Sequence, residues 1–208
     1  MTFTGFSAAA GILLAGIAHD NTKAFFEAHR LEYIANIRQP LEDLLGEVQD
    51  LYGSGRVMRP NRDVRFSNDK SPYKTSAAMS AGSLGGVYLS VGATGLEVGG
   101  GLYNPSRDQL VNARNAITGR PVVAKHLGEI VGGLRRTGFV MAGPSLTTAP
   151  RGFDRDHPAI ELLRLKHYAA VKQLPLGATP ELIRETWRAV EPLIAWCSQN
   201  VGAADPGT

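Results

Sequence analysis

The chain has 208 residues, of which 43% are hydrophobic and 20% are charged, and its formal net charge is +3 at pH 7. This composition is typical of a globular protein, and a net charge this small does not indicate a dedicated polyanion-binding protein. The single cysteine, Cys197, excludes an intramolecular disulfide and any metal site built from several cysteines.

An uncharged apolar run occupies residues 8–18 near the N-terminus. No Lys or Arg precedes it, whereas a signal peptide needs a positively charged start and a membrane span needs about 20 apolar residues. We therefore expect a short buried helix here, no membrane association and a cytoplasmic location.

From Asp20 to Leu51, apolar side chains recur at steps of three and four residues. This period predicts an amphipathic helix. Pro40 interrupts the pattern, so we expect either a kink or two consecutive helices, the first of which ends near Gln39. His29 lies on the apolar face and is interpreted as a structural histidine.

Short strands are predicted in the middle of the chain, at residues 75–81, 87–91 and 96–102, with a hairpin turn at 92–95. The glycines at 99–101 are not followed by the Lys-Ser or Lys-Thr pair of a phosphate-binding P-loop. They are expected to permit a close backbone approach, either of a neighbouring strand or of a ligand.

The C-terminal part of the chain carries several helix starts. Ser106 with Gln109 three residues later forms a capping-box pattern, and Pro121 opens a second helix. A short helix is predicted after Pro158, and a long terminal helix after Thr179. Strands are predicted between these helices, at 139–142 and 168–174.

The strands cluster in the middle, and the regular helix–strand alternation of a doubly wound sheet is missing. We therefore expect an α+β fold, in which a short-stranded antiparallel or mixed sheet is covered by helices from the N- and C-terminal parts of the chain. Residues 1–202 are predicted to form a single domain, and residues 203–208 a disordered tail. Oligomeric state is not predicted.

Basic residues concentrate between positions 56 and 74. This segment has a net charge of +4, which exceeds that of the whole chain. Its cations are Arg56, Arg59, Arg62, Arg65, Lys70 and Lys74, and its acids are Asp63 and Asp69.

The same segment has the pattern of a hairpin. Residues 62–67 alternate like a strand, and Ser67-Asn68-Asp69 is typical of a turn. Pro72 favours an extended residue before it, so a return strand is expected to begin near Tyr73. This hairpin would gather Arg65, Asp69, Lys70 and Lys74 at one end of the sheet.

The order Arg59-x-x-Arg62-Asp63-x-Arg65-Phe66, followed by Asp69-Lys70 and Tyr73, resembles the signature of a bacterial family catalogued as domain of unknown function 2461. Residues 21–30 resemble the family's opening Asn-Asn-Lys-Glu-Trp-Phe, and residues 151–158 resemble a later element. The resemblance spans about residues 6–197. Thr22 and Phe25 depart from the family's usual Asn and Trp. The resemblance implies no particular activity.

One interpretation of the segment is a site for a phosphorylated or carboxylated small molecule, with or without catalysis. Arginine suits planar anions and lysine suits a point charge. In this interpretation Asp63 or Asp69 acts as an acid or base and Tyr73 donates a proton. The ligand-binding residues would be Arg59, Arg62, Arg65, Lys70 and Lys74.

Two other interpretations remain open. The hairpin could bind nucleic acid, with Phe66 or Tyr73 stacking on bases. It could instead be a purely structural network, in which the pairs Arg65–Asp69 and Arg62–Asp63 hold the loop. No cofactor and no metal are predicted, since the five histidines lack metal-ligand spacing.

Overall fold

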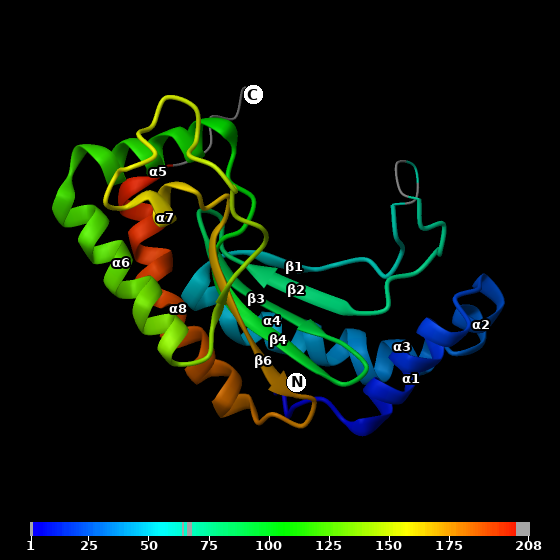
Figure 1. Cartoon of the computed structure of the whole chain (residues 1–208). Coiled ribbons are helices and arrows are strands. Elements are labelled where there is room, and N and C mark those ends of the chain that lie inside the picture. Colours follow the sequence, from blue (N-terminus) through cyan, green and yellow to red (C-terminus); the bar gives the residue numbers. More distant parts are fainter. Residues whose placement is uncertain (1, 64, 66–67, 203–208) are drawn as a thin grey trace. The chain divides into compact units, whose positions relative to one another are not determined.

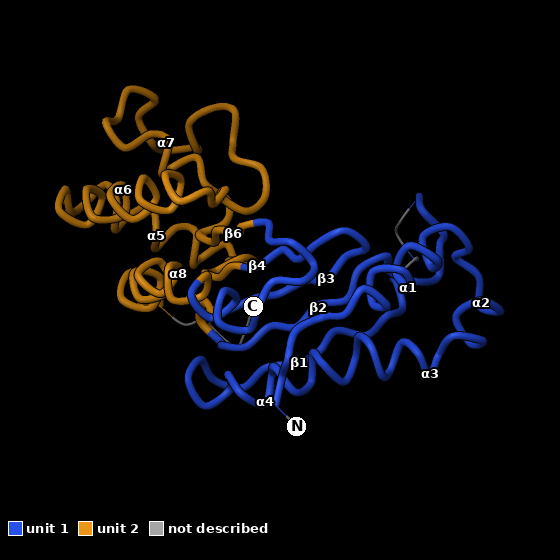
Figure 2. The backbone as a smooth tube through the Cα atoms, turned by 90° about the horizontal axis from the view of Figure 1, so that it is seen from below, with its two compact units in different colours: residues 1–83, 87–98, 173–185 blue, residues 84–86, 99–172, 186–208 orange. Residues whose placement is uncertain are grey.

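The computed structural model describes residues 2–63, 65 and 68–202, and the predicted tail at 203–208 lies outside the described residues. The chain forms two compact units (Figure 2). Unit 1 comprises Met1–Ser83, Val87–Val98 and Gln173–Glu185, and unit 2 comprises Leu84–Gly86, Gly99–Lys172 and Thr186–Thr208. That residues 1–202 act as a single domain stays a prediction.

The strands form a six-stranded antiparallel sheet in the order β1-β2-β3-β4-β6-β5 (Figure 1). With the helices, this sheet confirms the α+β fold class. The short first strand was not predicted, whereas the others lie close to their predicted positions. The strands are β1 (Gly55–Val57), β2 (Ala77–Ala81), β3 (Gly86–Val91), β4 (Gly95–Leu102), β5 (Val140–Met141) and β6 (Tyr168–Pro175).

Helices at the N-terminal end belong to unit 1. The predicted buried helix is α1 (Ala8–His19), in which Leu14 is fully buried. The helix boundary expected at Pro40 is also present. Helix α4 begins at Gln39, so Pro40 lies in its first turn, where its missing N–H is tolerated. The helices between α1 and α4 are α2 (Lys23–Ala28), α3 (Arg30–Tyr33) and the π-helical segment η1 (Ile34–Arg38).

Helix α4 (Gln39–Tyr52) packs on one face of β1 and β2. A Cβ atom built on Gly55 would lie 2.7 Å from Leu45 Cδ1, so glycine permits this close approach. Met79 and Leu89, which pair across β2 and β3, are fully buried. Because side chains alternate along a strand, this packing determines which side chains of β1 and β2 point toward α4.

Unit 2 has its own apolar core, which includes Ile117, Leu127 and Trp196. The predicted capping box is confirmed: Gln109 N donates to Ser106 Oγ, and Ser106 N donates to Gln109 Oε1. Cys197 is buried among these apolar residues, as expected. The helices of unit 2 are α5 (Arg107–Gly119), α6 (Pro121–Arg136), α7 (Ile160–Leu163) and, from Thr186 onward, α8 (Pro180–Asn200).

Within the described residues, none of the helices combines the length and the apolar character that crossing a membrane would require.

Candidate functional site

The segment between β1 and β2 doubles back on itself. Asn61 and Tyr73 form an antiparallel bridge, Arg62 N donates to Pro72 O at 2.9 Å, and Lys74 N donates to Pro60 O at 2.9 Å. Tyr73 therefore lies on the returning arm, as predicted. The strand expected at residues 62–67 is not present in the part of that range that the structure describes. The bridge to Tyr73 is formed one residue earlier, by Asn61. Val64, Phe66 and Ser67 lie outside the described residues.

The turn between α1 and α2 holds the base of this segment (Figure 1). Tyr73 N donates to Asn21 Oδ1 at 2.9 Å, and Asn21 Nδ2 donates to Tyr73 O at 3.0 Å, so the amide side chain pairs with backbone like a neighbouring strand. The Phe26 ring stacks on Tyr73 with centroids 4.0 Å apart and planes at 11°. Neither contact could be predicted from the sequence patterns, because 52 positions separate Asn21 from Tyr73.

Both acids of the segment are engaged by arginines. Arg65 binds Asp63 through two atoms, with Nε 3.0 Å from Oδ1 and Nη2 2.7 Å from Oδ2. Arg62 forms an ion pair with Asp69. The structural interpretation expected the pairs Arg65–Asp69 and Arg62–Asp63, so the described pairs reverse that assignment. The loop backbone, which sequence spacing does not define, decides which partners meet.

These contacts lower both carboxyl pKa values from 3.8. Hydrogen bonds from Arg65 lower the pKa of Asp63, and hydrogen bonding by Ser71 lowers the pKa of Asp69. Ser71 N donates to Asp69 Oδ1 at 2.9 Å. Both side chains are therefore ionised near neutral pH and act as acceptors.

The cations differ in exposure. The Arg65 side chain is 77% exposed, and Arg59 and Lys70 are also exposed. Lys74 is half-buried, and its Nζ donates to Arg59 O at 3.1 Å, which brings the two arms of the segment together. Arg62 is half-buried, and its Nε atom has no hydrogen-bond partner among the described residues.

Tyr73 is only 5% exposed and is stacked on Phe26, so its ring belongs to the support of the segment. This burial argues for positioning of the returning arm. A proton-donor role for Tyr73 stays a prediction.

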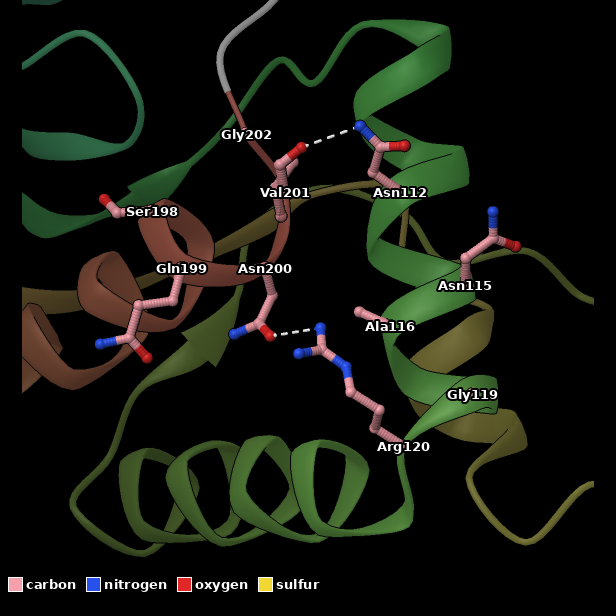
Figure 3. A pocket seen from close by; sticks show the side chains of 10 residues that line it. All are labelled: Asn112, Asn115, Ala116, Gly119, Arg120, Ser198, Gln199, Asn200, Val201 and Gly202. Atoms are coloured by element: carbon pink, nitrogen blue, oxygen red, sulfur yellow. Dashed lines mark hydrogen bonds between the residues drawn. The ribbon is translucent and has the colours of Figure 1, made fainter.

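Two hollows lie on unit 2. The first, of about 530 Å³, is polar and shallow (Figure 3); beside it Arg120 Nη2 donates to Asn200 Oδ1 at 2.9 Å and Asn112 Nδ2 donates to Val201 O at 3.0 Å. The second, of about 480 Å³, is lined by His157, by the charged residues Lys125 and Glu161, and by apolar residues of α5, α6 and α7. Neither lining includes a residue of the 56–74 segment.

The glycines at 99–101 serve close packing of backbone. A Cβ on Gly99 would lie 2.7 Å from Val171 Cα, and one on Gly100 would lie 2.6 Å from Gly86 O. Gly101 has φ +117, a conformation that other residues rarely adopt. Of the two expectations for these glycines, the contacts support the approach of neighbouring strands.

Comparison with known proteins gave one family. A search of the curated proteins gave no significant match. The family model described as "Conserved hypothetical protein (DUF2461)" matches residues 12–196, which is most of the chain and includes the basic segment. The chain therefore belongs to the DUF2461 family.

Proposed function

We propose that the 56–74 segment of unit 1 binds a small anionic molecule, phosphorylated or carboxylated. The proposal depends on one observation, the excess of positive charge that the segment keeps after its two acids are paired with arginines. Asp63 and Asp69 are each paired with an arginine inside the segment. The remaining excess of positive charge comes from Arg56, Arg59, Lys70 and Lys74.

The acids have a positioning role in this proposal. Asp63 binds one edge of the Arg65 guanidinium, which restricts its orientation while the side chain stays largely exposed. A planar fork held in this way is suited to a carboxylate or phosphate. A lowered pKa leaves both carboxyls ionised near neutral pH and makes them weaker bases, so Asp63 and Asp69 are suited to accept hydrogen bonds and not to donate a proton.

The test is thermal unfolding with and without about 10 mM phosphate. For a Kd of about 1 mM, linkage stabilises the native state by about 1.4 kcal/mol, which raises Tm by roughly 3–5 °C. In Arg65→Met and Lys70→Met we expect little change in Tm without phosphate and loss of the phosphate-dependent shift, since exposed charges contribute little to stability.

Arg155→Met is the matched control. Arg155 forms an exposed ion pair with the neighbouring Asp156, its side chain is 85% exposed, and it lies in unit 2. We expect this variant to retain the full phosphate shift. Absence of a shift in the native protein, together with a large loss of Tm in Arg65→Met, would contradict the proposal and favour a structural network.

Nucleic acid binding is tested separately with a single-stranded oligonucleotide. Binding to a phosphate backbone would weaken steeply between about 50 and 200 mM salt. Arg65→Met with Lys70→Met would reduce that slope. Steep, variant-sensitive binding of the oligonucleotide without a response to phosphate would replace the small-molecule proposal.

A further inference from the structure

The second hollow of unit 2, of about 480 Å³, lies where α5, α6 and α7 contact one another (Figure 1). Sites for small molecules enclose about 300–1,000 Å³ and are mostly apolar, with a few polar groups that orient the ligand. All residues of the lining belong to unit 2. The hollow is therefore a candidate for a ligand site that is separate from the basic 56–74 segment.

One face of α6 forms a side of this hollow. Its lining residues are Pro121, Ala124, Lys125 and Gly128, at the three- and four-residue steps that place helical residues on one face. Of the described residues, a Cβ atom built on Gly128 would meet only Leu162, whose Cδ1 lies 4.0 Å away. A helical side chain covers the turn before it, so a larger residue at position 128 would fill the hollow beside Ala124 and Lys125.

The floor of the hollow is apolar. Ile117 of α5 is buried, and Ala124, Ala159 and Leu162 are partly buried against the apolar core of unit 2. An apolar cavity of about 150 Å³ is large enough to hold benzene. The hollow therefore has the volume and the apolar surface for a ring with a short side chain.

His157 adds a polar group of fixed orientation to this lining. Ala159 N donates to His157 Nδ1 at 3.0 Å, and Ile160 N donates to His157 O at 2.9 Å. Because Nδ1 accepts a hydrogen bond, the neutral ring carries its proton on Nε2. The half-buried ring thus retains Nε2–H as its hydrogen-bond donor.

The two charged residues of the lining differ in how they are paired. Glu161 forms an ion pair with Arg164, in which Oε1 lies 2.9 Å from Nη1. Lys125 Nζ lies 3.9 Å from Glu129 Oε1, which is long for an ion pair, and both side chains are largely exposed. Such a contact contributes little to stability, so Lys125 can bind another anion at low cost. The donors Lys125 and His157 together complement a negatively charged group.

We propose that the second hollow binds a small carboxylic acid with an apolar body, such as an arylalkyl carboxylate. The carboxylate accepts hydrogen bonds from the Lys125 ammonium and from His157 Nε2–H, and the apolar body lies against Ala124 and Leu162. This site is independent of the function proposed for the 56–74 segment.

The experiment is an NMR titration of the ¹⁵N-labelled protein with 3-phenylpropionate, compared with acetate and with the neutral 3-phenylpropanamide. We expect 3-phenylpropionate to shift the amide signals of Gly128 and Ala159. Half-saturation should occur at a concentration at least about tenfold lower than for acetate, because the ring is buried, and at least about threefold lower than for the amide, because Lys125 binds the charge. Signals of the 56–74 segment report the anion site proposed above and are scored separately, so either proposal can fail while the other stands.

Two pairs of variants test the assignment to this hollow. Gly128→Leu fills the hollow and should abolish the response of Ala159, whereas Gly133→Leu, on α6 but outside the lining, should leave it unchanged. Lys125→Met should remove the advantage of 3-phenylpropionate over the amide. Lys166→Met, at an exposed lysine of unit 2 outside the lining, should retain that advantage.

Several outcomes would overturn the proposal. Equal binding of 3-phenylpropionate and the amide would exclude recognition of the carboxylate, and a response that survives in folded Gly128→Leu would exclude the hollow. No shift at Gly128 and Ala159 with about 20 mM 3-phenylpropionate, whether or not the 56–74 segment responds, would also overturn it. If Gly128→Leu does not fold, Lys125 variants decide: loss of the advantage in Lys125→Met with retention in Lys125→Arg supports the site, and any other pattern overturns it.

Discussion

Asp63 and Asp69 hold the arginines of the basic segment, and their lowered pKa values give these contacts a defined pH dependence. A carboxyl with a lowered pKa in the folded state contributes stability above its unfolded value, here 3.8, and that contribution is lost as the pH falls through the folded pKa. We therefore expect local order of the segment to decrease only below pH 3.8.

Carboxyl chemical shifts measured by NMR as a function of pH test this expectation. Both midpoints should lie below 3.8, and amide exchange at Ser71, which donates to Asp69, should accelerate over the same pH range. In Asp69→Asn the midpoint of Asp63 should stay low, because Arg65 is the main cause of that shift. A midpoint at or above 3.8 for Asp63 would refute the pairing.

Cys197 lies in the core of unit 2, where burial raises the pKa of its thiol to about 12. The thiolate is the reactive form, so a thiol reagent at about pH 8 should modify the native protein far more slowly than the unfolded protein. Labelling rates with and without denaturant measure this difference. Equal rates would show that this part of the core opens readily.

Some contacts of single residues could be predicted from the sequence, and others could not. The Ser106 capping box follows from two side chains three positions apart, so local pattern was sufficient. The contact of Asn21 with Tyr73 was missed, because it depends on how α1 and α2 are placed beside the segment. The arginine–aspartate pairs were assigned to the wrong partners for the same reason: the path of the loop, and not the spacing, determines which groups meet.

At the scale of elements, Asn21 joins the α1–α2 turn to the returning arm of the basic segment. Asn21→Ala removes both hydrogen bonds to the Tyr73 backbone. We expect a loss of about 1–3 kcal/mol in unfolding free energy, because a partly buried donor and acceptor lose their partners. Amide exchange at Tyr73 should become faster, and the phosphate-dependent shift smaller. Thr22→Ala, which removes only the N-cap bond to Phe25 N, is the control and should leave exchange at Tyr73 unchanged.

The glycines of the chain differ in what surrounds them, and two alanine substitutions separate these cases. A Cβ at Gly99 would collide with backbone of β6, whereas one at Gly46, within α4, would meet nothing within 4 Å. Gly99→Ala should destabilise the protein by about 1–3 kcal/mol through steric strain. Gly46→Ala should stabilise it by about 1 kcal/mol, since alanine favours a helix. Chemical denaturation measures both, and a neutral Gly99→Ala would argue against the close approach.

The strands show why most elements could be predicted and β1 could not. Strands β3 and β4 carry apolar runs around a glycine turn, a local pattern that was sufficient. Strand β1 has three residues, two of them exposed, and exists because it pairs with β2 more than twenty positions later. The π-helical turn η1 was missed similarly: Pro40 predicts a boundary, but not how the preceding turn adapts.

At the scale of the whole molecule, the two compact units share continuous elements. Strands β4 and β6 and helix α8 each run from one unit into the other. When such a strand or helix loses its order in one unit, it also loses hydrogen-bond and packing partners in the other. We therefore expect the described chain to unfold in a single cooperative transition. This is the behaviour that the prediction of one domain requires.

The tryptophans allow a direct test, because Trp187 and Trp196 both lie in unit 2 and both are buried. A perturbation placed in unit 1 should then move the unfolding transition seen by tryptophan fluorescence. Glu47 is suited to this purpose: its carboxylate accepts from Phe3 N at 2.7 Å and from Arg184 Nη2 at 2.6 Å, contacts that lie entirely within unit 1.

Glu47→Ala leaves these donors without their acceptor, which should lower the unfolding free energy by about 1–3 kcal/mol. If the units unfold together, the fluorescence midpoint and the far-UV circular dichroism midpoint fall by the same amount. Glu129→Ala, at an exposed glutamate on α6 of unit 2 whose ion pair with Lys125 is also exposed, is the control for the loss of one negative charge. A circular dichroism curve that splits into two steps, with the tryptophan transition unmoved, would show instead that the two units unfold independently despite the elements they share.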